Sequence, residues 1–375
     1  MTVDHDRFVD APVSLRSLLE RNERSFAETV AVVDGGVAYT YADVASAARL
    51  CATHLAAQGL DRGDRVLVLL PNSYEALVAF FGAQWLGLVT VPVSPRLRAL
   101  QVGHVIADSG AAAVITSAEH RHLADDARGA ASEVRVLPAE TLQDATASSC
   151  PAVEIEGGDL ANLLYTSGST GLAKGVMLSQ TNLLAGAWSV STYLGLTPAD
   201  RVLAALPWSF DYGLNQVLST FWAGGTVIPE RSTYARTLSN AVHDHRITGL
   251  AGVPPMWEML VRRPSSLLAR PLPSLRFVTN SGGALPPDIV AAIRSAHPHV
   301  DIYPMYGLTE AFRSTYLSPE LVDEHPTSIG RAIPGAEILV LDDDVREVDV
   351  DEPGELVHRG PTVALGYWGD RSSTE

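Results

Sequence analysis

The sequence has 375 residues, enough for two or three structural units around a large core, and hydrophobic residues make up 46% of it, which excludes a disordered chain. With 27 Lys and Arg against 43 Asp and Glu, its formal charge of −16 argues against partners such as nucleic acids or an anionic membrane surface. The presence of only two cysteines, Cys51 and Cys150, and a polar, acidic N-terminus indicate no disulfide framework and no signal peptide, so we expect a cytoplasmic protein.

Strand-like and helix-like segments alternate in the first part of the chain. Arg65–Leu70 is a continuous apolar run of strand length, which is typical of a strand buried on both faces. Ser73 follows it and can cap the next helix. The most apolar stretch, 76–93, contains Gln84 and Pro92 and therefore indicates a buried helix and a strand, not a membrane span. The predicted segments are helices 15–24, 41–59, 74–86 and 100–108, a hairpin over 31–40, and strands 65–70, 89–93 and 112–116.

Residues 118–159 are rich in Ala, Ser, Asp and Glu with weak periodicity, and we expect them to lie at the surface where a first lobe ends. The alternation then resumes, with Ser179 or Thr181 placed to cap a helix that runs to Trp188. Strands are predicted at 160–164, 201–206, 226–228, 249–253 and 276–279, and helices at 214–222, 239–245, 256–262 and 287–296. This order predicts the α/β fold class, with two α/β lobes of mainly parallel sheets flanked by helices, at 1–155 and 156–324.

The pattern of the sequence changes from residue 325 onward. Short strand-like segments, such as 337–341 and 355–359, are separated there by turns that contain glycine and proline. This pattern predicts a small C-terminal β-barrel subdomain at 325–375.

The most informative stretch is Tyr165–Val176, which reads YTSGSTGLAKGV. Its glycines permit turns that point successive backbone N–H groups at an anion, its hydroxyls add donors, and Lys174 adds a compact positive charge. These residue types predict a phosphate-binding loop, against the alternative of a flexible polar surface loop. The residues predicted to contact ATP in this stretch are Thr166, Ser167, Gly168, Ser169, Thr170, Gly171 and Lys174.

This loop departs from the P-loop pattern, in which a glycine, four further residues and then Gly-Lys-Ser/Thr open a helix. The sixth position from Gly168 is Ala173, Lys174 is followed by Gly175, and Val176–Leu178 resembles a strand. A P-loop NTPase stays an alternative, which would require a helix directly after the loop and the release of ADP.

Tyr165–Gly175 matches throughout the signature Tyr-Thr-Ser-Gly-Ser/Thr-Thr-Gly-x-x-Lys-Gly of the AMP-forming adenylate ligase superfamily. The chain therefore resembles acyl-CoA synthetases, peptide-synthetase adenylation domains and luciferases over essentially its whole length. The resemblance implies the large N-terminal portion of such an enzyme, with two α/β lobes and a β-barrel.

A second segment, Gly282-Gly283-Ala284, follows a predicted strand, and ligands of open α/β sheets bind at the carboxyl ends of strands. From the residues alone, a tight turn before a helix is an equal alternative. The resemblance implies that these three residues line the adenine and the carboxylate pocket.

A third segment, Tyr306–Glu310, fits the family pattern Tyr-Gly-x-Thr-Glu, and Gly307 is its glycine. The resemblance implies that Tyr306 stacks on adenine, that Thr309 contacts the α-phosphate and that Glu310 holds Mg²⁺. One position departs from the pattern: Pro304 stands where the family usually has an Asn or Gln that reads the adenine edge. Adenine recognition would then depend more on backbone groups.

The segment Leu206–Gln216 concerns the substrate. Many acyl-CoA synthetases have a histidine at the position of Phe210, whereas peptide-synthetase adenylation domains have Phe-Asp, as here, and that aspartate pairs with the substrate's α-amino group. A buried Asp211 needs a partner, which a substrate ammonium would supply; alternatively it caps the following helix or faces solvent. Trp208 and Tyr212 equally suit a hydrophobic acyl gate. The residues predicted to bind the acid are Trp208, Phe210, Asp211, Gly282, Gly283, Gly307 and Leu308.

The resemblance implies activation of a carboxylic acid as an acyl-adenylate, with ATP and Mg²⁺, and transfer to a thiol of CoA or of a carrier-protein phosphopantetheine in the full-length enzyme. We favour an acyl-CoA ligase; an amino-acid-activating enzyme that loads an acyl carrier protein and a non-catalytic nucleotide- or acyl-binding module are alternatives. The expected catalytic residues are Thr166, Lys174, Thr309 and Glu310, with Glu310 as the metal ligand. The superfamily's C-terminal domain, which brings a catalytic lysine, is absent from these 375 residues, so we expect low activity from this chain alone.

Overall fold

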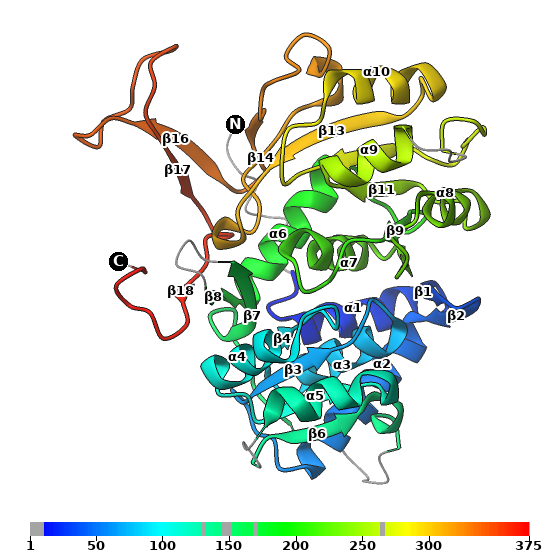
Figure 1. Cartoon of the computed structure of the whole chain (residues 1–375), viewed down its shortest axis with the longest axis vertical. Helices are drawn as coiled ribbons and strands as arrows, with labels where there is room; N and C mark the ends of the chain where they lie inside the picture. The colour runs from blue at the N-terminus through cyan, green and yellow to red at the C-terminus, as the bar shows by residue number, and fades with distance from the viewer. Residues whose placement is uncertain are drawn as a thin grey trace.

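The computed structural model describes residues 11–129, 133–144, 150, 152–167, 172–262 and 267–374. Two large sheets, each flanked by helices, form two lobes that lie one above the other in Figure 1, and a two-stranded ribbon extends from one side. The alternation of strands and helices and the mainly parallel pairing agree with the predicted α/β class. In the described part of the chain, every helix is too short or too polar to cross a membrane.

The lower sheet has seven strands in the order β18-β8-β7-β4-β3-β5-β6. Neighbours from β7 to β6 pair in parallel, whereas β8 and β18 extend the sheet as antiparallel strands. The strands are β3 (Arg65–Leu69), β4 (Val89–Pro92), β5 (Ala113–Thr116), β6 (Arg135–Pro138), β7 (Leu160–Ser167), β8 (Ala173–Ser179) and β18 (Gly366–Tyr367). The helices of this lobe are α1 (Leu15–Phe26), α2 (Tyr41–Ala57), α3 (Tyr74–Trp85), α4 (Ala99–Ser109) and α5 (Arg121–Arg128).

β3 is buried on both faces, as its unbroken apolar run predicts. Val66 and Val68 belong to the core that includes α2 and α3, whereas Leu67 and Leu69 belong to the core that includes α4 and α5. Successive side chains of a strand point to opposite faces, so one apolar strand can serve two cores. The cap of α3 is also as predicted, because the Ser73 Oγ accepts a hydrogen bond from the backbone N–H of Ala76 at 3.1 Å.

The upper sheet has nine strands in the order β15-β14-β13-β12-β11-β9-β10-β1-β2, with parallel pairing from β13 to β1. The strands are β1 (Val30–Asp34), β2 (Val37–Thr40), β9 (Arg201–Ala204), β10 (Thr226–Pro229), β11 (Gly249–Gly252), β12 (Phe277–Asn280), β13 (Asp301–Tyr306), β14 (Thr315–Tyr316) and β15 (Arg331–Ala332). Its helices are α6 (Gln180–Tyr193), α7 (Asp211–Ala223), α8 (Ala235–Asp244), α9 (Pro254–Arg262) and α10 (Pro287–Ala296).

Helices α6 and α7 lie between the two sheets, and α8, α9 and α10 cover the far face of the upper one (Figure 1). Phe221 of α7 stacks on Phe81 of α3 with ring centroids 5.2 Å apart, so the two lobes share one apolar core. The upper sheet therefore packs, through α7, on the helices of the lower lobe.

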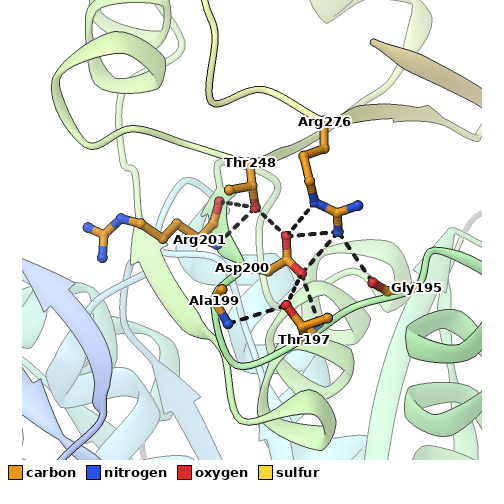
Figure 2. A network of polar contacts seen from close by, with 7 residues as sticks. All are labelled: Gly195, Thr197, Ala199, Asp200, Arg201, Thr248 and Arg276. Carbon is orange, nitrogen blue, oxygen red and sulfur yellow. Dashed lines mark hydrogen bonds and ion pairs between the residues drawn. The ribbon is translucent and has the colours of Figure 1, made fainter. Parts of the chain in front are cut away.

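A buried aspartate holds the opposite edge of the upper sheet (Figure 2). Asp200 is 2% exposed, and its carboxylate accepts hydrogen bonds from the Thr197 backbone N–H, the Thr248 hydroxyl and the Arg276 guanidinium at 2.7 to 3.0 Å. Asp200, Thr248 and Arg276 directly precede β9, β11 and β12, so one carboxylate aligns the amino ends of three parallel strands.

Three expectations differ from the structure. Residues 118–159 contain α5 and the strand β6, which pairs with β5, because the buried Ala124, Val134 and Leu137 supply apolar contacts that the weak periodicity conceals. The helix expected at 214–222 begins at Asp211. The described residues after 325 form no closed barrel: β16 (Glu337–Leu341) and β17 (Glu355–Arg359) make a separate ribbon, and β15 and β18 join the two large sheets.

The predicted divisions after residues 155 and 324 stay predictions, and strand pairing crosses both. The hairpin of β1 and β2, which was predicted, lies on the upper sheet, where β1 pairs with β10. β7 and β8 pair with the strands of the first lobe, and β18 pairs with β8.

Candidate active site

The predicted phosphate loop connects two antiparallel strands, β7 and β8. Thr166 and Lys174 are register partners at the end of this hairpin, and the Tyr165 hydroxyl donates to Asp108 Oδ2 at 2.6 Å. Gly175 packs closely against Tyr165, because a Cβ there would lie 3.1 Å from the Tyr165 ring and the ring would have to shift. The predicted ATP contacts Gly168, Ser169, Thr170 and Gly171 lie outside the described residues, as does the side chain of Ser167.

The strand that follows this loop excludes the P-loop alternative. A P-loop leads from a strand directly into a helix, whose N-terminus faces the phosphates. Here β8 follows the loop, and α6 begins only after it, with Ser179 as its cap.

Lys174 is held by residues near the end of the chain, which the sequence pattern did not reveal. Its Nζ donates to Asp370 Oδ2 at 2.8 Å and to Ser373 Oγ at 2.9 Å. The ammonium, together with two hydroxyls and a backbone N–H, holds the pKa of the Asp370 carboxyl well below its usual range. The predicted phosphate ligand is thus positioned at the surface with its charge balanced.

Glu310 lies in a short 3-10 turn after β13. Its Oε1 accepts a hydrogen bond from the Tyr367 hydroxyl at 2.7 Å, and that bond raises the pKa of Tyr367 to about 12. Tyr367 sits between both predicted phosphate-handling groups, because its ring centroid lies 5.3 Å from Lys174 Nζ. Strand β18 therefore links the loop of β7 and β8 to Glu310.

The chemistry of one carboxylate fits Mg²⁺, which keeps several waters and takes substrate phosphates as further ligands. Among the described residues, no cluster of three or more His, Cys, Asp or Glu side chains could hold a metal ion by itself. Glu310 would thus hold the ion together with the nucleotide.

A cavity of about 320 Å³ brings two of the predicted segments together. The turn Gly282-Gly283-Ala284 and the residues Tyr306 and Gly307 line it, as do Pro304 within β13 and Asn280 at the end of β12. Gly282 and Gly283 have φ of +76° and +156°, a backbone that favours glycine and forms the turn around the cavity. Residues 326–329 form part of its wall.

Asp211 is buried and already has a partner within the chain. Its Oδ2 accepts from Arg313 Nη1 at 2.9 Å, and the two residues are 4% and 2% exposed. Thr309 Oγ1 lies 3.5 Å from the other carboxylate oxygen, so this ion pair adjoins the predicted α-phosphate contact. Arg313 was not predicted from the sequence. Its one signal there is an arginine among small and apolar residues, three positions after Glu310.

Beside this ion pair lies a small cavity of about 30 Å³. Tyr212, Asn215, Gln216 and Arg313 line it. The Arg313 Nη2, the Asn215 Nδ2 and both amide atoms of Gln216 are buried without hydrogen-bond partners in the protein. These unsatisfied polar groups thus belong to residues of a cavity whose lining is otherwise largely apolar, with Val190, Leu194 and Phe277.

The predicted acid-binding residues do not converge on one cavity. Trp208 lines a different apolar cavity with Leu70 and Phe80 of the first lobe. Phe210 and Leu308 are 40% and 49% exposed, and Gly282, Gly283 and Gly307 line the 320 Å³ cavity described above.

Residues 19–368 match the model of the AMP-binding enzyme family. The feruloyl-CoA synthase of Amycolatopsis sp is 33% identical over 362 residues, which cover 94% of this chain and 71% of that protein. An L-proline–[L-prolyl-carrier protein] ligase of Pseudomonas fluorescens is 31% identical over 374 residues, which cover 94% of this chain and 74% of that protein. The solved structure of VinN with L-aspartate aligns with a TM-score of 0.87 at 31% identity, covering 97% of this chain and 93% of that one.

Proposed function

Because this chain belongs to the AMP-binding enzyme family, we propose that it activates a carboxylic acid with ATP as an acyl-adenylate and passes the acyl group to a thiol of CoA or a carrier protein. The observation that supports this best is the 320 Å³ cavity, where the turn at Gly282 and Gly283 faces the Tyr306 segment directly before Thr309 and Glu310. An aromatic face and two hydroxyl or carboxylate groups at the carboxyl edge of a parallel sheet suit a nucleotide.

In the proposed reaction, a carboxylate oxygen of the acid attacks the α-phosphorus of ATP, and the bond from that phosphorus to the bridging oxygen of pyrophosphate breaks. Thr309 contacts the α-phosphate, and Thr166 and Lys174 hold the β- and γ-phosphates. Glu310 holds Mg²⁺, which would neutralise developing charge on the phosphates. These residues act by positioning the reactants and stabilising charge, which is how enzymes supply most of the rate in phosphoryl-group chemistry.

Exchange of labelled pyrophosphate into ATP, measured with a panel of carboxylic acids, tests the first step. We expect exchange that depends on the acid and falls at least about a hundredfold in Lys174→Ala and Glu310→Gln, the loss typical of one charge-stabilising contact. Release of ADP, or binding of ATP with no exchange for any acid, would contradict the proposal and favour a nucleotide-binding module.

A second candidate concerns the acid, and the ion pair of Asp211 and Arg313 favours it. A plain alkyl acid would leave the Arg313 Nη2 and the Gln216 amide buried without partners, which costs free energy. We propose as this candidate an amino acid that carries a further anionic group, with its ammonium near Asp211 and its anion near Arg313. VinN has been solved with L-aspartate, and the prolyl-carrier ligase is named for an amino acid.

Thermal shifts with two non-hydrolysable adenylate analogues separate the two candidates. A larger shift with an aspartyl analogue than with an alkyl one, lost in Arg313→Met, supports the amino acid. A shift with the alkyl analogue alone supports an acyl-CoA ligase and leaves the ion pair a structural role. Comparison of CoA with a phosphopantetheinylated carrier protein as the acceptor then identifies the thiol.

A further inference from the structure

Asn280 is one of the residues that line the 320 Å³ cavity. Asn280 is the last residue of β12, directly before the turn at Gly282 and Gly283, and is only 2% exposed. Among the described residues that line this cavity, it is the one that carries a side-chain amide. The sequence analysis assigned no role to it.

Asn280 is the register partner of Pro304 on the neighbouring parallel strand β13. Register partners in a parallel pair point to the same face, and neighbouring strands lie about 4.8 Å apart. Pro304 has neither a backbone N–H nor a polar side chain, and its carbonyl already accepts from the Leu317 N–H at 2.8 Å, so its side chain cannot replace the family's amide. Asn280 therefore places an amide one strand away from the position where the resemblance predicted one.

The orientation of the Asn280 amide is fixed by one hydrogen bond. Its Nδ2 donates to the backbone carbonyl of Gly283 at 2.8 Å, which identifies the other atom as the oxygen. That Oδ1 is buried and accepts no hydrogen bond within the protein. A buried acceptor without a donor is costly and is uncommon in native structures.

We propose that Asn280 reads the adenine of ATP, with its Oδ1 accepting a hydrogen bond from the exocyclic 6-amino group. The inference rests on the proposed function, which puts the nucleotide in this cavity. The base would then lie against the Tyr306 ring, with its amino edge toward β12. Guanine carries an oxygen at the same position, and two acceptors facing each other would disfavour it.

Binding of ATP and of purine riboside triphosphate, which lacks the 6-amino group, tests the proposal. We expect the wild type to bind ATP about three- to tenfold more tightly than purine riboside triphosphate, which is the effect of one hydrogen bond. In Asn280→Ala the two affinities become equal. Loss of the bond to Gly283 also loosens the turn, but it weakens both nucleotides alike, so the ratio reports only on the base.

Two further variants keep the test decisive. Asn280→Asp retains an acceptor and should keep the preference for ATP, while Thr192→Ala, at an exposed position of α6 that does not line the cavity, should leave both affinities unchanged. An unchanged ratio in Asn280→Ala, or no preference in the wild type, would overturn the role of Asn280 while nucleotide binding stands. Binding of neither nucleotide by the wild type would remove the proposed function and the inference with it.

Discussion

Asp211 and Arg313 form a buried ion pair, with 2.9 Å between Oδ2 and Nη1, that joins the first turn of α7 to the segment after Glu310. The Arg313 guanidinium also lies 4.7 Å from the centroid of the Tyr212 ring. The pair thus connects the 30 Å³ cavity lined by Asn215 and Gln216 to the residues that we propose to contact the α-phosphate and Mg²⁺.

Removing one partner of this pair should destabilise the protein strongly. In Arg313→Met, the Asp211 carboxylate stays buried without a cation, and we expect the free energy of unfolding to fall by about 3–5 kcal/mol. The double variant Asp211→Asn/Arg313→Met should lose less than the two single variants combined, because it leaves no unpaired charge. Urea denaturation measures all three, and additive losses would contradict a coupled pair.

The lobes were predictable because their strands are continuous apolar runs between clear breaks, as Arg65–Leu69 shows. The expected barrel does not form among the described residues, because short strands separated by turns carry no signal of which sheet they join: β15 pairs with the neighbouring β14 of the upper sheet, whereas β18 pairs with β8 of the lower sheet, more than a hundred residues earlier in the chain. Only the two strands of the ribbon, β16 and β17, pair with each other.

The parts of the candidate site that lie within one short sequence motif were predictable. The turn at Gly282 and Gly283 and the segment from Tyr306 were each recognisable, and the structure brings them to one cavity; the family resemblance is confirmed. The partners of these motifs were not predictable, because Arg313, Asp370 and Tyr367 contact them only through tertiary structure.

His358 should make stability depend on pH. It lies on β17, half-buried, with Nδ1 3.0 Å from the Ser314 hydroxyl, and burial lowers its pKa below the ordinary 6.5. The His358 side chain therefore binds a proton more readily in the unfolded chain than in the folded protein. Its contribution to the free energy of unfolding is complete above pH 6.5, and it is lost as the pH falls through the lower pKa of the folded state. Melting temperatures at pH 7.5 and 5.5 should differ less in His358→Gln than in the wild type; an equal difference would exclude this role.

Asp370 should compete with nucleotide phosphates for Lys174, if Lys174 holds them as we propose. In Asp370→Asn, the Lys174 ammonium loses its counter-ion, and a negative charge is removed from the proposed phosphate site. We therefore expect ATP to bind about two- to fivefold more tightly, a small effect because solvent screens an exposed ion pair. Asp159→Asn breaks a comparably exposed pair with Arg62 away from the loop and serves as the control. Calorimetric titration with ATP measures both variants, and equal affinities in the two would show that Asp370 does not compete.

The carboxylate of Asp200 should matter for stability and not for catalysis. Asp200→Ala removes the hydrogen bonds that the carboxylate accepts from a backbone N–H, a hydroxyl and the Arg276 guanidinium at the amino ends of three strands (Figure 2). We expect the free energy of unfolding to fall by about 2–3 kcal/mol. Asp323→Ala, which breaks an exposed pair with Arg294, should cost less than about 0.5 kcal/mol, because solvent screens that pair. Since the strand ends that Asp200 aligns lie opposite the cavity edge, pyrophosphate exchange by the folded Asp200→Ala variant should match the wild type. Equal destabilisation in the two variants, or a loss of exchange in the folded Asp200→Ala protein, would contradict a purely structural role.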